Sequence, residues 1–126
     1  MEINNPEIVE EMTDAFMSYE KALKDNDVKM INHLFWNDPK TLRYGPNGTL
    51  ISHAALSAFR RDRKTEGVRR KLKNTQIITF GRDFAVANTE ADDESEPGTL
   101  RQSQTWARTA DGWKIVSAHV SYLQDS

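Results

Sequence analysis

The sequence predicts an α+β domain in which a curved antiparallel sheet wraps around three N-terminal helices and leaves a cavity between them. Two observations lead to this prediction. Apolar residues near the N-terminus recur three and four positions apart, whereas everything after Gly67 alternates as strands do. Near the C-terminus, LRQSQTWARTADGWKIVSAHVSYL contains two long alternating runs joined by an Asp-Gly loop, which is typical of a β-hairpin.

Three helices are expected in the first half of the chain. Asn5 is suited to cap the first, and Tyr19 falls on its buried stripe. Pro39 follows the second helix and forces an extended conformation at Asp38. The expected helices run from Pro6 to about Lys24, from Val28 to Phe35, and from a cap at Ser52 to about Arg63.

Strands are expected from residue 41 onwards. The short runs TLRYG and GTLI flank a turn formed by Pro46, Asn47 and Gly48. The remaining strands are expected from Val68 to Phe80, from Phe84 to about Ala91, and in both arms of the C-terminal hairpin. The acidic segment DDESEPG, residues 92–98, is expected to be a solvated loop.

The hairpin carries polar, recognition-type side chains on strands that should be half-buried. Its register is expected to place Arg108 opposite Trp113. Counting away from the loop then sets Trp106 opposite Ile115, Gln104 opposite Ser117, and Gln102 opposite His119, all on one face. Neither face is cleanly apolar, which favours a wet pocket on one side and a dimer interface on the other.

Composition limits the class of protein. The 126 residues are expected to form one domain, residues 1–126, that buries a core without disulfides. Cysteine is absent, and His33, His53 and His119 lie far apart in the sequence, so no metal site is expected. A net charge of −2 gives no overall attraction for nucleic acid or an anionic membrane. We therefore expect a soluble, cytoplasmic protein that binds neither.

Several segments of the sequence resemble those of one protein family. YEKALKDND, LFWNDPKTLRYG, AFRRDR, ITFGRDFAVANTE and the hairpin sequence are similar to the AtzH-like, or oxalurate-catabolism, proteins. These belong to the cystatin-like cone folds of the nuclear transport factor 2 and ketosteroid isomerase superfamily. The resemblance implies a cone-shaped, strongly bent antiparallel sheet over three helices, and a homodimer paired through the sheet. It also implies decarboxylating amide hydrolysis of a small N-carboxylated urea in ureide or triazine catabolism.

Arg43 and Tyr19 are the main catalytic candidates. A planar guanidinium can hold a carboxylate in two parallel hydrogen bonds, which suits Arg43 to an N-carboxylated substrate. The sequence alone does not say which face of the TLRYG strand lines the cavity. Tyr19 is either a core aromatic residue or, as the cone fold implies, a cavity hydroxyl that donates to a developing oxyanion or relays a proton.

Other polar residues are assigned weaker roles. His119 is a third catalytic candidate as general base, with a purely structural hydrogen-bonding role as the alternative. Arg60 belongs to a basic cluster that is either solvated or provides a second carboxylate contact. The substrate-binding candidates are Trp36, Tyr44, Arg60, Gln104 and Trp106.

The sequence therefore predicts a homodimeric cone that binds a small anionic urea or amide and needs no cofactor, with Arg43 as carboxylate clamp and Tyr19 as acid. Two alternatives stay open. A non-catalytic ligand-binding protein, or an accessory subunit of an amidohydrolase partner, would keep the clamp without the proton relay. An isomerase-like enolisation would need Asp38 as its base.

Overall fold

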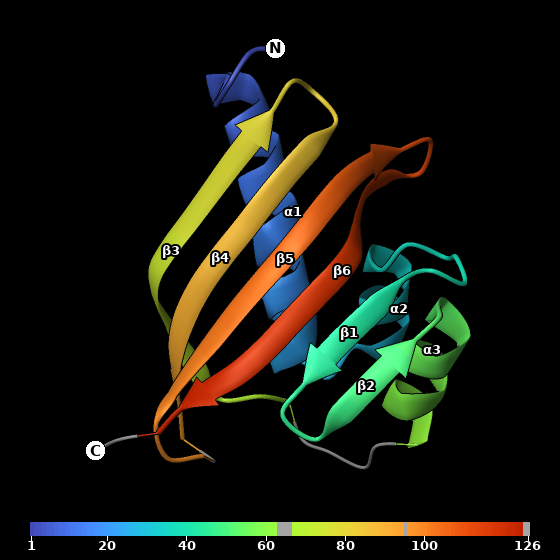
Figure 1. The fold of residues 1–126 in the computed structure, drawn as a ribbon, viewed down its shortest axis with the longest axis vertical. Coiled ribbons are helices and arrows are strands. Elements are labelled where there is room, and N and C mark those ends of the chain that lie inside the picture. Colours follow the sequence, from blue (N-terminus) through green and yellow to red (C-terminus); the bar gives the residue numbers. More distant parts are fainter. Residues whose placement is uncertain (63–66, 95, 125–126) are drawn as a thin grey trace.

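The computed structural model describes residues 1–62, 67–94 and 96–124. Within these residues three helices cover one face of a six-stranded sheet, and the predicted α+β cone is confirmed (Figure 1). The side of the sheet toward the first helix is called the inner face here, and the opposite side the outer face. The elements are α1 (Pro6–Lys24), α2 (Val28–Leu34), β1 (Leu42–Gly45), β2 (Gly48–Ile51), α3 (His53–Asp62), β3 (Arg70–Phe80), β4 (Phe84–Asp93), β5 (Thr99–Thr109) and β6 (Gly112–Leu123).

Side-chain caps begin the helices at the predicted places. Oδ1 of Asn5 accepts a hydrogen bond from the backbone N–H of Glu7 at 2.9 Å, at the start of α1. The hydroxyl of Ser52 accepts from the N–H of Ala55 at 3.1 Å, at the start of α3. The end of the third helix, expected near Arg63, lies outside the described residues.

Helix α2 ends one residue earlier than expected. Phe35 leaves the helix with extended backbone angles and forms a parallel bridge to Ile115 of β6. The chain thus changes from helix to strand pairing at Phe35, and this residue is buried in the core.

The strands form one mixed sheet in the order β2-β1-β6-β5-β4-β3. Neighbouring strands are antiparallel except β1 and β6, which are parallel, so the expected all-antiparallel sheet is wrong at this one pair. The β3–β4 ladder also extends into the segment expected to be a loop. Lys71 pairs with Asp92 and Arg70 with Asp93, and these cross-strand pairs of opposite charge favour the longer ladder.

A bulge in β6 makes the register of the C-terminal hairpin differ from the predicted one. Trp106 pairs with Ile115 as predicted, but the next pair is Thr105 with Ser117, which leaves Val116 as an extra residue in β6. The expected pairs Gln104–Ser117 and Gln102–His119 are therefore wrong. Instead Gln104 pairs with Ala118, Gln102 with Val120, and Ser103 with His119. A shift of one residue reverses the faces of a strand, so His119 moves to the face opposite the glutamines.

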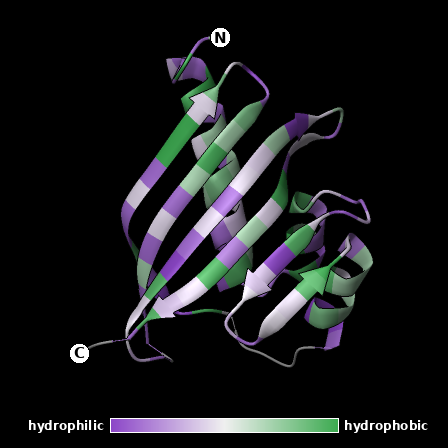
Figure 2. Ribbon diagram, viewed as in Figure 1, coloured by the Kyte–Doolittle hydropathy of each residue, from purple (hydrophilic) through white to green (hydrophobic). Residues whose placement is uncertain are grey.

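Polar and apolar residues alternate along the central strands (Figure 2). The apolar set packs between the inner face and α1 around residues such as Phe16, Trp106 and Ile115, which are fully buried. No helix within the described part of the chain is long and apolar enough to cross a membrane.

Candidate functional site

A row of residues on the inner face runs across five strands and contains both Gln104 and Arg43. Strand pairing aligns Ala87 of β4, Gln104 of β5, Ala118 of β6, Arg43 of β1 and Leu50 of β2. Ala87 and Ala118 are buried in the core, and Leu50 packs against it, so the whole row faces inward. The structure thus places the side chain of Arg43 on the inner face, a direction that the sequence left open. Within this row Gln104 lies between two alanines, Ala87 and Ala118.

Tyr19 of α1 packs beside this row, against Trp106, which lies two residues after Gln104 on β5. Its ring packs edge to face against Trp106, with centroids 6.4 Å apart, and against Phe35 at 5.8 Å. Such edge-on contacts fix the plane of a tyrosine ring and therefore the direction of its hydroxyl. Helix α1 and strand β5 together bring the predicted residues Tyr19, Gln104 and Trp106 into one group.

The side-chain amide of Gln104 is oriented by its neighbour. Its Oε1 accepts a hydrogen bond of 2.9 Å from the indole Nε1 of Trp106. An indole N–H can only donate, so the atom facing it must be the oxygen, and the NH2 group must point away. Gln104 is 1% exposed, and its Nε2 has no hydrogen-bond partner. A buried donor without a partner costs about 1–3 kcal/mol, which an acceptor on a ligand would offset.

A second oriented amide lies two residues along β5. Oε1 of Gln102 accepts a hydrogen bond of 3.2 Å from Nη2 of Arg70, and a guanidinium likewise can only donate. The same Arg70 is held by both carboxylate oxygens of Glu20, at 2.6 and 2.8 Å from Nη2. Gln102 is 4% exposed, and its Nε2 also has no partner.

Sequence reasoning missed the Glu20–Arg70 ion pair, although it had one visible signal. Glu20 continues the stripe Ile8, Met12 and Phe16 at intervals of four, so it is a carboxylate in a buried position. A buried carboxylate requires a buried cation or a set of donors. The partner could not be found from the sequence, because Arg70 is 50 positions away.

The guanidinium of Arg43 lies over the backbone of Gly45. An ideal Cβ built on Gly45 would be 2.5 Å from Nη1 of Arg43, so a larger residue would displace the guanidinium. Arg43 is half-buried, which gives its end of the inner row contact with solvent. The segment RYG, residues 43–45, thus combines the cation of Arg43 with Gly45, the small residue that leaves space for its guanidinium.

Arg60 is also withdrawn from solvent. It lies in the last turn of α3 and is buried, with its Cζ 5.6 Å from the centroid of the neighbouring Phe59 ring. The reading of Arg60 as part of a solvated helix face is therefore wrong. Its role as a substrate contact stays a prediction.

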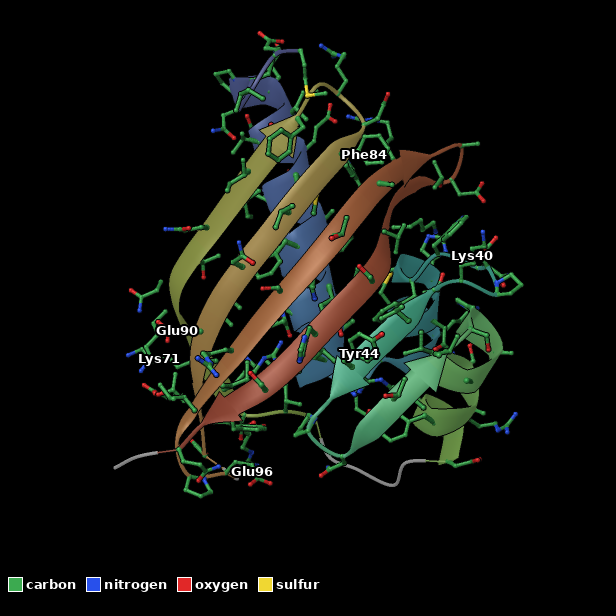
Figure 3. The ribbon with its side chains drawn as sticks, viewed as in Figure 1. Lys40, Tyr44, Lys71, Phe84, Glu90 and Glu96 are labelled. Atoms are coloured by element: carbon green, nitrogen blue, oxygen red, sulfur yellow. The ribbon has the colours of Figure 1, made fainter. Side chains whose placement is uncertain are left out.

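His119 and Tyr44 lie together on the outer face. Their rings pack edge to face with centroids 5.6 Å apart, on the paired strands β6 and β1. Figure 3 labels Tyr44 on β1. His119 also lines a polar hollow of about 400 Å³ with Arg101, Glu90 and Asn74. Because the sheet separates them from the Tyr19 group, these two residues cannot contact the same small ligand as Gln104.

Trp36 lines a different hollow, of about 490 Å³, between α2 and the β5–β6 loop. The buried Lys114 also lines it and donates a 2.6 Å hydrogen bond to the backbone carbonyl of His33. Burial lowers the pKa of Lys114 below its usual value. The structure therefore separates Trp36 from the inner row.

Asp38, the candidate base for enolisation, lies in the connection before β1. Its Oδ1 accepts a hydrogen bond from the backbone N–H of Lys40 at 2.8 Å, which is a local turn contact. Its backbone carbonyl accepts from His53 at 3.1 Å. Among the described residues, no group of three or more histidine, aspartate or glutamate side chains is placed to hold a metal ion.

The fold and the inner face define an NTF2-like, cystatin-like cone protein with buried, oriented polar groups against its first helix. The chain belongs to the AtzH-like family, whose model matches residues 1–126. Family and fold together indicate a protein that binds or transforms a small molecule.

Solved structures agree with this assignment. A cystatin-like fold protein from Burkholderia xenovorans is 45% identical, covers 100% of this chain and 99% of its own, and has a TM-score of 0.93. A protein of unknown function from the DUF3225 family of Pectobacterium atrosepticum is 43% identical, with 97% and 95% coverage and a TM-score of 0.93. An NTF2-like superfamily protein from Salmonella enterica, at 23% identity, 96% and 94% coverage and a TM-score of 0.77, shows the fold alone. No curated protein matches the chain.

Proposed function

We propose that this protein is a decarboxylating amidohydrolase that acts on a small N-carboxylated urea bound at the inner face. The observation that carries the proposal is the buried, oriented NH2 group of Gln104, which requires an acceptor and lies in one row with Arg43. Urea carbonyls and carboxylates are such acceptors. The resemblance to the AtzH-like family, whose model matches the chain, implies the same class of substrate.

Each residue has a defined task in the proposed complex. Arg43 binds a substrate carboxylate through parallel hydrogen bonds, and Gln104 donates to the urea carbonyl. Their strands are two positions apart in the sheet, about 10 Å between backbones, and both side chains are long enough to reach a ligand over the intervening Ala118. Tyr19 supplies a proton from the α1 side of this ligand.

The reaction proceeds by proton transfer and bond cleavage. The carbamate nitrogen gains a proton from Tyr19, the bond between nitrogen and the carboxylate carbon breaks with its electrons going to nitrogen, and carbon dioxide leaves. Water returns the proton to Tyr19 and hydrates the carbon dioxide, so the net result is hydrolysis of that bond. Orientation and charge control suffice for this step, which needs no cofactor. His119 has no part in it, because it lies on the outer face.

Kinetics of single variants test the proposal. We expect Tyr19→Phe to lower kcat for an N-carboxylated urea by roughly 100-fold with little change in binding, because the hydroxyl acts mainly in the transition state. Arg43→Lys should weaken both binding and turnover. Tyr122→Phe and Arg101→Lys are matched controls, since these residues lie away from the inner row, and both should behave like the wild type.

Two results would contradict the mechanism. Turnover that is unchanged in Tyr19→Phe would remove Tyr19 as the acid. Wild-type protein that binds carboxylated ureas but releases no carbon dioxide above the spontaneous rate would favour the second candidate, a non-catalytic ligand-binding protein or accessory subunit of an amidohydrolase. The same oriented amides support that candidate, because they favour binding of an acceptor whether or not it reacts.

A further inference from the structure

The inner face presents two side-chain amide donors, Gln104 and Gln102. The Glu20–Arg70 ion pair orients the amide of Gln102. Gln102 and Gln104 occupy alternate positions of β5, so their side chains leave the same face about 7 Å apart. Each amide has its oxygen held by a neighbour that can only donate, and each has a buried NH2 group without a partner. A single such group could be a defect of packing. Two such groups on neighbouring inward positions of one strand, each with its oxygen already bound, indicate a binding feature.

We propose that Gln102 and Gln104 together bind an oxygen acceptor group of the ligand, and that Glu20 and Arg70 are positioning residues for Gln102. The inference rests on the proposed function for the class of ligand, a small carboxylate, and adds a second donor to the site. Two NH2 groups provide four N–H bonds and no acceptor, so they favour carboxylate or carbonyl oxygens over amide nitrogens.

The Glu20–Arg70 pair makes this orientation stable. Arg70 binds the two oxygens of Glu20 through Nε and Nη2, and Nη2 also donates to Oε1 of Gln102. If the amide of Gln102 rotated by half a turn, its NH2 group would face a guanidinium donor, and the buried contact would be lost. The ion pair, being nearly as buried as the amide, therefore holds the NH2 group toward the ligand.

Gln102→Met tests whether Gln102 binds the ligand. Methionine has similar length but no polar group, so it removes both the NH2 group that lacks a partner and the oxygen that accepts a hydrogen bond from Arg70. If Gln102 contacts the ligand, we expect the affinity for malonate to fall about tenfold or more. A purely structural glutamine would leave this affinity unchanged, whatever the change in melting temperature. Gln76→Met, on an exposed position of β3, is the matched control and should change neither.

Nuclear magnetic resonance provides a direct measurement that does not depend on turnover. The side-chain NH2 signals of Gln102 and Gln104, assigned with the two Gln→Met variants, should both shift when malonate is added and should shift much less with malonamide, its uncharged analogue. The signal of Gln76 should stay in place. Arg70→Met should broaden or move the Gln102 signal in the unliganded protein and reduce its response to malonate.

The outcomes separate this inference from the proposed reaction. If malonate shifts only Gln104, or if Gln102→Met leaves both malonate affinity and KM unchanged, the role of Gln102 is overturned while the proposed reaction can still stand. If both amides shift but no carboxylated urea is turned over, the paired donor site stands and the proposed reaction fails. If neither amide shifts at millimolar malonate, the inference is overturned.

Discussion

Gln104 shows how the chemistry of one side chain depends on a neighbour that can only donate. The sequence identified Gln104 and Trp106 as candidates, because they belong to a set of recognition-type side chains on a half-buried hairpin. It could not show that the indole binds the amide oxygen and leaves the NH2 group toward the interior. That direction comes from a contact of 2.9 Å between side chains of one strand, which only the folded structure defines.

Gly45 limits where the guanidinium of Arg43 can lie. We expect Gly45→Ala to change the free energy of unfolding by less than about 1 kcal/mol, because the nearest atoms belong to the end of a flexible side chain. The new methyl group would nevertheless displace the guanidinium, and KM for a carboxylated urea should rise by roughly tenfold. Steady-state kinetics and urea denaturation measure the two effects. Thr49→Ala, in the same hairpin, is the control, and an unchanged KM in Gly45→Ala would contradict the assigned position of Arg43.

Lys114 should make stability depend on pH. Burial lowers its pKa below the usual 10.5, and the nearby carboxylate of Asp111 only partly offsets this. Between the lowered pKa of the folded state and the pKa of the unfolded chain, the unfolded state binds more protons, so stability rises with pH. The free energy of unfolding of the wild type, relative to Lys114→Met, should therefore increase as pH is raised toward 10.5. Urea denaturation at several pH values measures this difference, and a constant difference would contradict it.

Among the elements, the bulge in β6 marks the limit of sequence-based prediction. Alternation and the Asp-Gly loop predict two long strands and the pairs nearest the loop, because these depend on local periodicity and turn geometry. The extra residue Val116 has no comparable local signal, since a valine suits a regular strand and a bulged one equally. One inserted residue then moved His119 to the outer face, away from the glutamines. The helices were predicted more closely, because caps such as Asn5 and Ser52 act within a few residues.

The close approach of β3 to α1 requires Gly67. A Cβ on this residue would lie 1.6 Å from the backbone carbonyl oxygen of Lys24, and the next residue, Val68, donates a hydrogen bond to Leu23 at 3.1 Å. Gly67→Ala should destabilise the protein by roughly 3 kcal/mol, because backbone rather than a side chain must move.

Thermal unfolding measures this effect as a fall in melting temperature of about 10 °C. Gly81→Ala is the control. Gly81 has a positive φ of 62° but an open surrounding, so only the backbone cost of roughly 1 kcal/mol applies. Equal losses in the two variants would contradict the close contact at Gly67.

At the scale of the molecule, we predict a homodimer joined across the outer face of β5 and β6. The outer face carries exposed apolar residues at one end, where Phe84 is 57% exposed at the start of β4 (Figure 3). Sedimentation should give a mass of about twice 14.4 kDa. Ser117→Arg, at the centre of this face opposite Thr105, should shift the protein toward monomer.

A charged residue introduced on the helical side of the molecule, away from the outer sheet face, should not shift the protein toward monomer. Met17 on α1 is 49% exposed, so Met17→Arg is the matched control. A wild-type protein that sediments as a monomer at micromolar concentration would remove the predicted interface. Dissociation by both variants would indicate a general loss of folding instead.

The parallel pairing of β1 with β6 links the order of synthesis to the assembly of the inner row. Arg43 aligns with Gln104 only through Ala118, a residue of the last strand. A ribosome-bound chain that lacks β6 can form helix α1 and the β1–β2 hairpin, yet it has no strand to hold these parts in register with β5. Contacts between residues so far apart in the sequence form late in folding. Under the proposed function, we therefore expect the nascent chain to bind no anionic ligand until β6 emerges, and a ligand to stabilise only the fold that contains β6.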